Sequence, residues 1–149
     1  MEVREKLNVS ADAFFDTLSQ SVLYDIQQAL GQEVLEDQVT PGYSYLKKMK
    51  NKVGQQGNIR VTIQHFSRPS RYAAAFESAQ GRNYISYEIT ELSKNSIEIH
   101  YEEGFEGKNT SGSLNYRLIS GIMERSAKKR MARTLHSMET YIQNKENEG

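Results

Sequence analysis

Three histidines are the side chains in this sequence best suited to proton transfer near neutral pH, and they lie far apart along the chain. His65 closes a segment in which Ile59, Val61 and Ile63 alternate with polar residues, so period-two spacing predicts that His65 shares their inward face. An inward imidazole could act as a general base or as a ligand donor. A hydrogen-bonded histidine at a strand end is the favoured interpretation.

His100 is flanked at alternate positions by Glu98 and Glu102, which places all three side chains on one face of a strand. Imidazole and carboxylates can together bind a divalent metal. The solvated face of an edge strand is the favoured interpretation, so no metal and no other cofactor is expected. The third histidine, His136, lies on the expected C-terminal helix.

Other catalytic sets are not apparent in the residue types. The chain has no cysteine, which excludes thiol catalysis and thiolate metal sites. Every aspartate precedes Gln38, so no Ser-His-Asp arrangement can be proposed. Glu102 and Glu103 are neighbours on a strand and point to opposite faces. The sequence therefore favours binding over enzymatic activity.

One dense group of basic residues lies near the C-terminus: Arg125, Lys128, Lys129, Arg130 and Arg133. Helical spacing spreads them around the face opposite an apolar stripe, so a solvated helix back is favoured over an anionic partner. The chain balances 19 basic against 19 acidic residues. That balance argues against a nucleic-acid partner, since such binders usually carry a basic excess.

The size and the N-terminus predict one cytoplasmic domain over residues 1–149, with about 144–149 as a frayed tail. The first residues lack the apolar core of a signal peptide. No apolar run approaches the ~20 residues needed to cross a bilayer, so no membrane span is expected. The oligomeric state is left open between monomer and homodimer.

The elements that must position these residues can be located from their periodicity. A strand is predicted over Val3–Val9, and Ser10 then caps a helical stretch that ends at Gly31. The polar residues 19–21 predict a break, which gives two short helices or one kinked helix.

Five further strands joined by short turns predict an antiparallel meander. They are Tyr43–Val53, Asn58–Phe66, Arg71–Ser78, Asn83–Leu92 and Ser96–Glu103. In the first of them the phase is open, because Tyr43, Tyr45 and Met49 compete with Leu46 for the inward face.

The final helix is predicted over Leu114–Ile142 from an apolar stripe at spacings of three and four. Its members are Ile119, Met123, Ala127, Met131, Leu135, Met138 and Ile142. At 1.5 Å per residue this helix is ~43 Å long, longer than any single strand. It must therefore cross the sheet diagonally or project beyond it.

Small side chains under this helix would leave space for a ligand. Residues 73–75 are all alanine, Tyr72 and Phe76 share the face beside them, and methionines adapt to varied ligands. We expect the ligand-binding residues to be Tyr45, Ile63, His65, Tyr72, Phe76, Tyr87, Tyr101, Ile119 and Met123. A closed, well-packed interior is the alternative.

This order of elements resembles the α+β helix-grip fold, in which a curved antiparallel sheet wraps on a long C-terminal helix. START lipid-transfer domains, birch-pollen-allergen-like proteins and polyketide cyclases share that fold. The opening strand and its continuation through residues 8–15 are similar to the entry of that superfamily. We count about six strands, one fewer than is common there, and find no catalytic set of its enzymatic branches.

More narrowly, the chain resembles a bacterial family of this fold whose function is unassigned. That family occurs mainly in Gram-positive bacteria and is often encoded near sugar-uptake genes. The resemblance therefore implies a context of sugar uptake or metabolism.

Three functions follow from these patterns. The leading hypothesis is a protein that binds an apolar or aromatic small molecule between the sheet and the C-terminal helix. The second is a protein-interaction or regulatory module without a ligand. The third is a small hydrolase or cyclase with His65 as its base.

Overall fold

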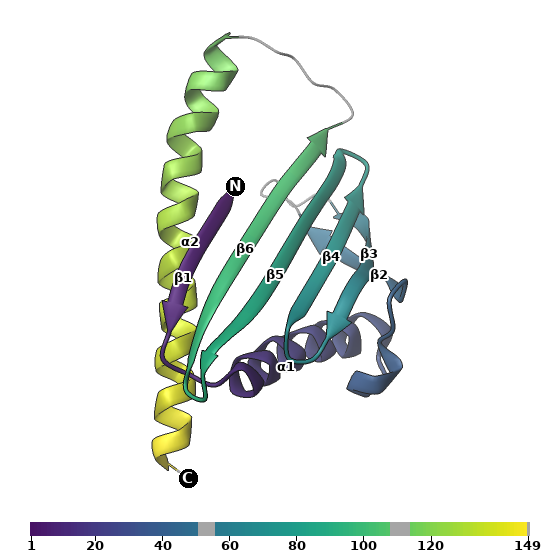
Figure 1. Ribbon diagram of the computed structural model, residues 1–149. Coiled ribbons are helices and arrows are strands. Elements are labelled where there is room, and N and C mark those ends of the chain that lie inside the picture. The colour runs from purple at the N-terminus through teal and green to yellow at the C-terminus, as the bar shows by residue number, and fades with distance from the viewer. Residues whose placement is uncertain (51–55, 108–113, 149) are drawn as a thin grey trace.

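The computed structural model describes residues 1–50, 56–107 and 114–148, leaving aside the side chains of residues 50, 56 and 114–122. Over these residues the architecture is α+β, with a six-stranded sheet and two α-helices (Figure 1). The predicted turn at 54–57 lies largely outside the described residues, as do residues 51–53 of the predicted second strand.

All strands of the sheet pair antiparallel, in the order β1-β6-β5-β4-β3-β2. Their bounds are β1 Glu2–Leu7, β2 Ser44–Lys50, β3 Gln56–Ser67, β4 Arg71–Ser78, β5 Gly81–Ser93 and β6 Ser96–Gly107. The predicted meander is confirmed, because β2 to β6 are neighbours in chain order and β1 joins beside β6. The strand that carries His100 is β6, which is an internal strand and not the edge strand expected.

Helix α1 (Ala11–Leu30) follows the first strand and begins and ends as predicted. The Ser10 hydroxyl accepts a hydrogen bond from the Ala13 N–H at 3.1 Å, and Gly31 closes the helix with a left-handed φ of 71°. The predicted break at residues 19–21 is wrong, since α1 is one continuous helix. The apolar stripe runs through that segment from Leu18 to Val22, and Ser19 is buried within it.

Helix α2 (Leu114–Glu148) runs beside β1 and extends beyond the N-terminal end of that strand (Figure 1). At 1.5 Å per residue its length is about 52 Å, so it projects beyond the sheet. The segment from 144 to 148 is helical, in contrast to the frayed tail expected there. Directly before this segment, Gln143 Nε2 donates a 3.0 Å hydrogen bond to the carbonyl oxygen of Asn8, which ties the last part of α2 to the residue after β1.

The core lies between one face of the sheet, called here the inner face, and the two helices. From α1, Phe14, Phe15 and Ile26 are fully buried, and from α2, Leu135 is fully buried. The open phase of β2 is now settled. Tyr45 is 5% exposed and Leu46 is 50% exposed, so β2 turns Tyr45 inward.

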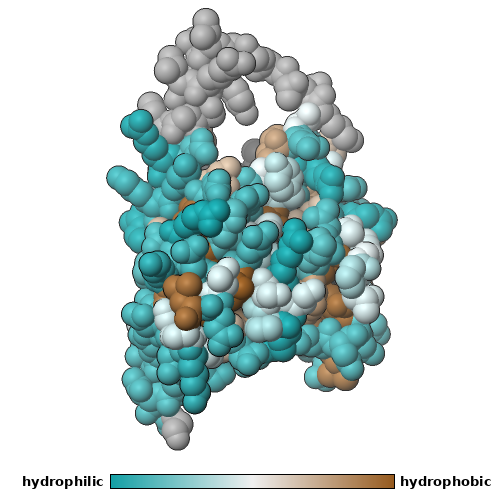
Figure 2. Space-filling model, in the orientation of Figure 1, coloured by the Kyte–Doolittle hydropathy of each residue, from teal (hydrophilic) through white to brown (hydrophobic). Residues whose placement is uncertain are grey.

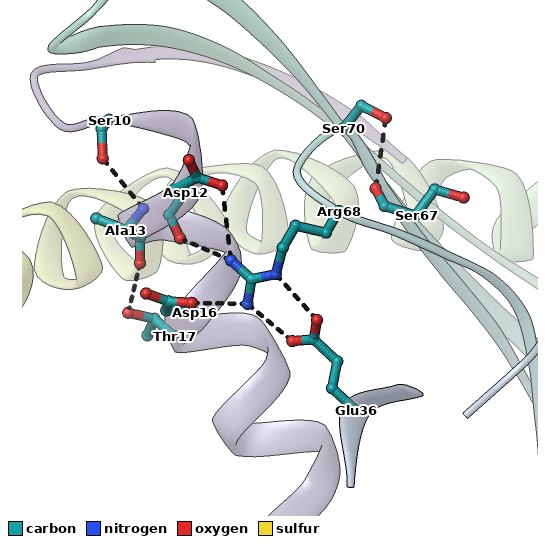
Figure 3. Close-up of polar contacts among 9 residues, drawn as sticks. All are labelled: Ser10, Asp12, Ala13, Asp16, Thr17, Glu36, Ser67, Arg68 and Ser70. Carbon is teal, nitrogen blue, oxygen red and sulfur yellow. Dashed lines mark hydrogen bonds and ion pairs between the residues drawn. The ribbon is translucent and has the colours of Figure 1, made fainter. Parts of the chain in front are cut away.

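Arg68, in the turn between β3 and β4, contacts both α1 and the segment that follows it (Figure 3). Its guanidinium donates two hydrogen bonds to Glu36, at 2.9 and 2.7 Å, in the short helix η1 (Glu36–Gln38). It also lies 2.6 Å from the Asp16 carboxylate and 4.9 Å from the centre of the Phe15 ring. This network holds η1 against α1 before the chain enters β2.

Hydrophilic side chains cover most of the face shown in Figure 2, and hydrophobic ones occur there in small groups. The basic residues at 125, 128, 129, 130 and 133 are all exposed, in agreement with a solvated helix back. Among the described residues, no helix is long and apolar enough to cross a bilayer.

Candidate functional site

An open cavity of about 340 Å³ lies between α1, the inner face of the sheet and α2. Five elements contribute to its wall, with α1 giving one side and strands β2, β4 and β5 the other. Its lining residues are Leu18, Ser21, Val22, Asp25, Tyr45, Lys47, Tyr72, Phe76, Ile85, Tyr87 and Met138. This volume falls in the range of small-molecule sites in proteins.

Two tyrosines from neighbouring strands form the aromatic part of the wall. Tyr72 of β4 is paired in register with Tyr87 of β5, and their ring centroids are 6.0 Å apart. Tyr72 is only 7% exposed. Within the residues that the structure describes, neither hydroxyl has a hydrogen-bond partner. Two largely buried tyrosines therefore bring unused polar groups to the cavity.

The polar part of the wall is a cluster of Asp25, Tyr45 and Lys47. The Tyr45 hydroxyl donates a 2.5 Å hydrogen bond to Asp25 Oδ2, and Lys47 Nζ lies 3.2 Å from both Asp25 oxygens. Lys47 Nζ is also 5.8 Å from the centre of the Phe76 ring. Burial, followed by the hydrogen bond to Asp25, raises the pKa of Tyr45. The cluster closes one end of the cavity with a paired positive and negative charge.

The structure brings together four of the nine residues expected at the site: Tyr45, Tyr72, Phe76 and Tyr87. Tyr101 packs its ring on Tyr87, at a centroid distance of 4.9 Å, and is outside the cavity lining. Its hydroxyl donates a 2.6 Å hydrogen bond to Glu103.

Ile63 and Ile119 were also expected at the cavity. Ile63 is fully buried in β3, where it pairs with Ala74, and it belongs to the core. The side chain of Ile119 lies outside the described residues.

His65 lies on the outer face of the sheet, so its predicted inward phase is wrong. The pairing of β3 with β4 shifts by one residue between Ile63 and His65, which is the mark of a β-bulge. The next residue, Phe66, takes the inward position and packs on Tyr72 at 5.9 Å between ring centroids. Because His65 is outside the cavity, the hydrolase or cyclase hypothesis loses its base.

Met123 is 63% exposed and also lies away from the candidate cavity. It borders a second hollow, of about 620 Å³, between α2 and strands β5 and β6. Met138, just over four turns further along α2, is the methionine that lines the candidate cavity. The part of α2 that meets the cavity is therefore its C-terminal half.

Sequence reasoning missed the contribution of α1 and the polar cluster. The signal for Asp25 was present, because spacings of four and three from Leu18 through Val22 place its carboxylate on the buried stripe of the helix. Lys47 alternates with Tyr45 on β2 and so shares its face. A charged residue on each of two facing apolar surfaces is a pattern from which the pair of Asp25 and Lys47 could have been predicted.

A separate cluster on the outer face groups His100 with carboxylates from three strands. His100 Nε2 lies 2.6 Å from Glu2 Oε1 and 3.2 Å from Glu102 Oε1, and Nδ1 lies 3.6 Å from Glu88 Oε2. One ligand atom from each of Glu2, His100 and Glu102 falls within 4.8 Å of the others, a spacing that could hold a metal ion. Glu98, named with them from the sequence, pairs with an arginine of β1 instead.

Comparison with solved structures identifies the fold. The structure of Ara h 8.0201 matches with a TM-score of 0.61 and 10% identity, over 97% of this chain and 97% of that one. A protein of unknown function, SA2116 from Staphylococcus aureus, matches with a TM-score of 0.62 and 11% identity, over 100% and 96% of the two chains. A START superfamily protein from Mycobacterium smegmatis matches with a TM-score of 0.55 and 10% identity, over 93% and 97%.

These likenesses confirm the helix-grip fold that the sequence resembled. At such low identities they establish the architecture alone. No curated protein sequence matches the chain. A family model described as a domain of unknown function, DUF3284, matches residues 1–124, and the chain belongs to that family.

Proposed function

We propose that this protein binds a small, mainly apolar molecule in the cavity between α1, the sheet and α2. The observation that carries the proposal is the hydroxyl of Tyr72, a side chain more than nine-tenths buried that faces this cavity without a partner among the described residues. Among the described residues, Arg82 Nε is the only fully buried side-chain nitrogen or oxygen atom without a partner, so the Tyr72 hydroxyl reaches the open cavity. A bound ligand can accept its hydrogen bond there.

The rest of the wall suits such a ligand. Leu18, Val22 and Met138 are apolar, and the rings of Phe76 and Tyr87 offer flat surfaces. Burying a ligand against these side chains supplies the favourable term, at roughly 25 cal/mol per Å² of apolar surface removed from water. The resemblance adds a setting in sugar uptake or metabolism, on which the proposal does not depend.

The test uses a neutral apolar fluorophore, N-phenyl-1-naphthylamine, whose emission rises when it leaves water. We expect saturable one-to-one binding to the wild-type protein. Met138→Trp inserts a large ring into the cavity, and we expect it to weaken binding at least tenfold.

Met123→Trp is the matched control, because it makes the same change on the same helix at a position outside the cavity. Circular dichroism checks that both variants fold. Absence of saturable binding to the wild type would refute the proposal, as would a loss of binding confined to Met123→Trp.

A further inference from the structure

The polar side chains of the cavity lining fall into three sets: an acceptor group bonded within the protein, a pair of tyrosine hydroxyls on the strands, and the exposed hydroxyl of Ser21 on α1. The acceptor group is the Asp25 carboxylate, which takes the hydrogen bond of Tyr45 and both contacts of Lys47 Nζ. A carboxylate offers about four lone-pair sites, so most of its acceptor capacity is used inside the protein.

The donor group is the pair of hydroxyls on Tyr72 and Tyr87, which donate to no residue that the structure describes. Burial raises the pKa of Tyr72, and it raises that of Tyr87 to about 12. Both phenols therefore keep their protons at neutral pH and present O–H groups. The strand pairing holds the two rings side by side, 6.0 Å apart between centroids.

The pairing of charges in the wall limits the charge that a ligand can carry. Among the described residues that line the cavity, Asp25 and Lys47 are the only charged ones, and they pair with each other. A carboxylate or an ammonium group on a ligand would lose its hydration and meet no free opposite charge. The wall consequently favours a neutral polar group over an ionised one.

Resting on the function proposed above, we infer that the cavity takes a neutral ring compound bearing a hydrogen-bond acceptor, such as a ketone or aldehyde carbonyl. The hydroxyls of Tyr72 and Tyr87 donate to that acceptor. The ring packs between Phe76 and the side chains of Leu18 and Val22.

Three probes of similar shape test the effect of the carbonyl acceptor and the effect of a negative charge separately: 2-acetylnaphthalene, 2-ethylnaphthalene and 2-naphthoate. Equilibrium dialysis with chromatographic measurement of the free probe gives each dissociation constant. We expect the ketone to bind the wild type roughly 2- to 12-fold more tightly than the ethyl compound, which is the contribution of about one hydrogen bond. We expect the carboxylate to bind more weakly than the ketone.

Tyr72→Phe and Tyr87→Phe remove only hydroxyl oxygens. We expect the double variant to bind the ketone and the ethyl compound equally, with the affinity for the ethyl compound retained. Tyr24→Phe is the matched control, because Tyr24 is 64% exposed on α1 and outside the lining, and it should keep the preference for the ketone.

Equal binding of ketone and ethyl compound by the wild type would overturn the inference while leaving the proposed function standing. Tighter binding of the carboxylate would overturn it too, as would a ketone preference that survives in the double variant. If none of the three probes binds, the inference and the proposed function both fail.

Discussion

Replacing Arg68 by alanine tests how the chain between α1 and β2 is held in place. The change removes two hydrogen bonds to Glu36, the ion pair with Asp16 and the cation over the Phe15 ring (Figure 3). It also leaves the carboxylates of Asp12, Asp16 and Glu36 near one another without the arginine that faces them.

The expected loss in the free energy of unfolding follows from the exposure of these groups. A hydrogen bond to a charged group contributes about 1.5–3 kcal/mol when shielded, whereas exposed ion pairs contribute about 0.2–1 kcal/mol. The side chains of Arg68 and Glu36 are 34% and 33% exposed, so we expect each contact with a carboxylate to contribute a free energy near the range for exposed ion pairs. The contact with the ring adds about 0.5–1 kcal/mol.

The sum predicts that Arg68→Ala lowers the free energy of unfolding by about 2 kcal/mol, or about 4–8 °C in the melting temperature. Arg68→Lys keeps the charge and loses the two-pronged contact, so about half of that loss is expected. Arg71→Ala is the control, because Arg71 is exposed in the same hairpin and has no ion pair among the described residues. Urea denaturation followed by circular dichroism measures all three.

The same network predicts how this cost varies with pH. The hydrogen bond from Arg68 lowers the pKa of Glu36 in the folded protein. The contribution of this hydrogen bond to the free energy of unfolding is therefore fully present above the ordinary carboxylate pKa. It is lost as the pH falls through the lowered pKa of Glu36. The difference between wild type and Arg68→Ala should narrow in acid. Equal urea midpoints at pH 7, or a difference that persists unchanged in acid, would refute the reasoning.

The remaining predictions concern α2 and one turn. His136 has a pKa raised by hydrogen bonds to Glu139 and to a carboxylate of β1, so its contribution to stability is complete below about pH 6.5 and is lost as the pH rises through the raised value. The difference in urea midpoint between wild type and His136→Gln should shrink from pH 6 to pH 9, and a constant difference would contradict this. Leu135→Ala should cost about 2–5 kcal/mol, because Leu135 is fully buried, whereas Met123→Ala should cost almost nothing; similar melting temperatures for the two variants would show that α2 packs differently. Gly81→Ala should destabilise the protein by more than 1 kcal/mol, since Gly81 has a φ of 150° and an added Cβ would lie 2.3 Å from a backbone oxygen of β6, and an unchanged melting temperature would count against that geometry.

Most of the fold could be predicted because its signals are local. The cap at Ser10 and the left-handed Gly31 depend on residue type within one turn of helix. Strand alternation works in the same way over stretches such as Ile59 to Ile63. The alternation fails immediately afterwards, because the bulge before His65 adds a residue without any change in residue types that would reveal it.

The site was harder to predict because it depends on which parts of distant elements meet. The apolar stripe of α2 has similar residues at Met123 and Met138, and periodicity gives both the same face. Only the docking of the helix places Met138 in the cavity and leaves Met123 in solvent. Tyr72 and Tyr87 were found because strand alternation already fixed their face, whereas the phase of Tyr45 was left open by the sequence.

The position of the cavity follows from a change along the buried stripe of α1. In its first turns the stripe is filled by large rings, and Phe15 packs on Phe66 at 5.3 Å between centroids. Further along, the stripe reaches Asp25, whose carboxylate is drawn to Tyr45 and Lys47 at one edge of the sheet. A large apolar residue at that position would pack across the inner face instead. The same polar cluster that anchors α1 to β2 therefore leaves volume in front of the tyrosines, and this explains why the candidate cavity lies chiefly beside α1, with Met138 as the residue that α2 contributes to its lining.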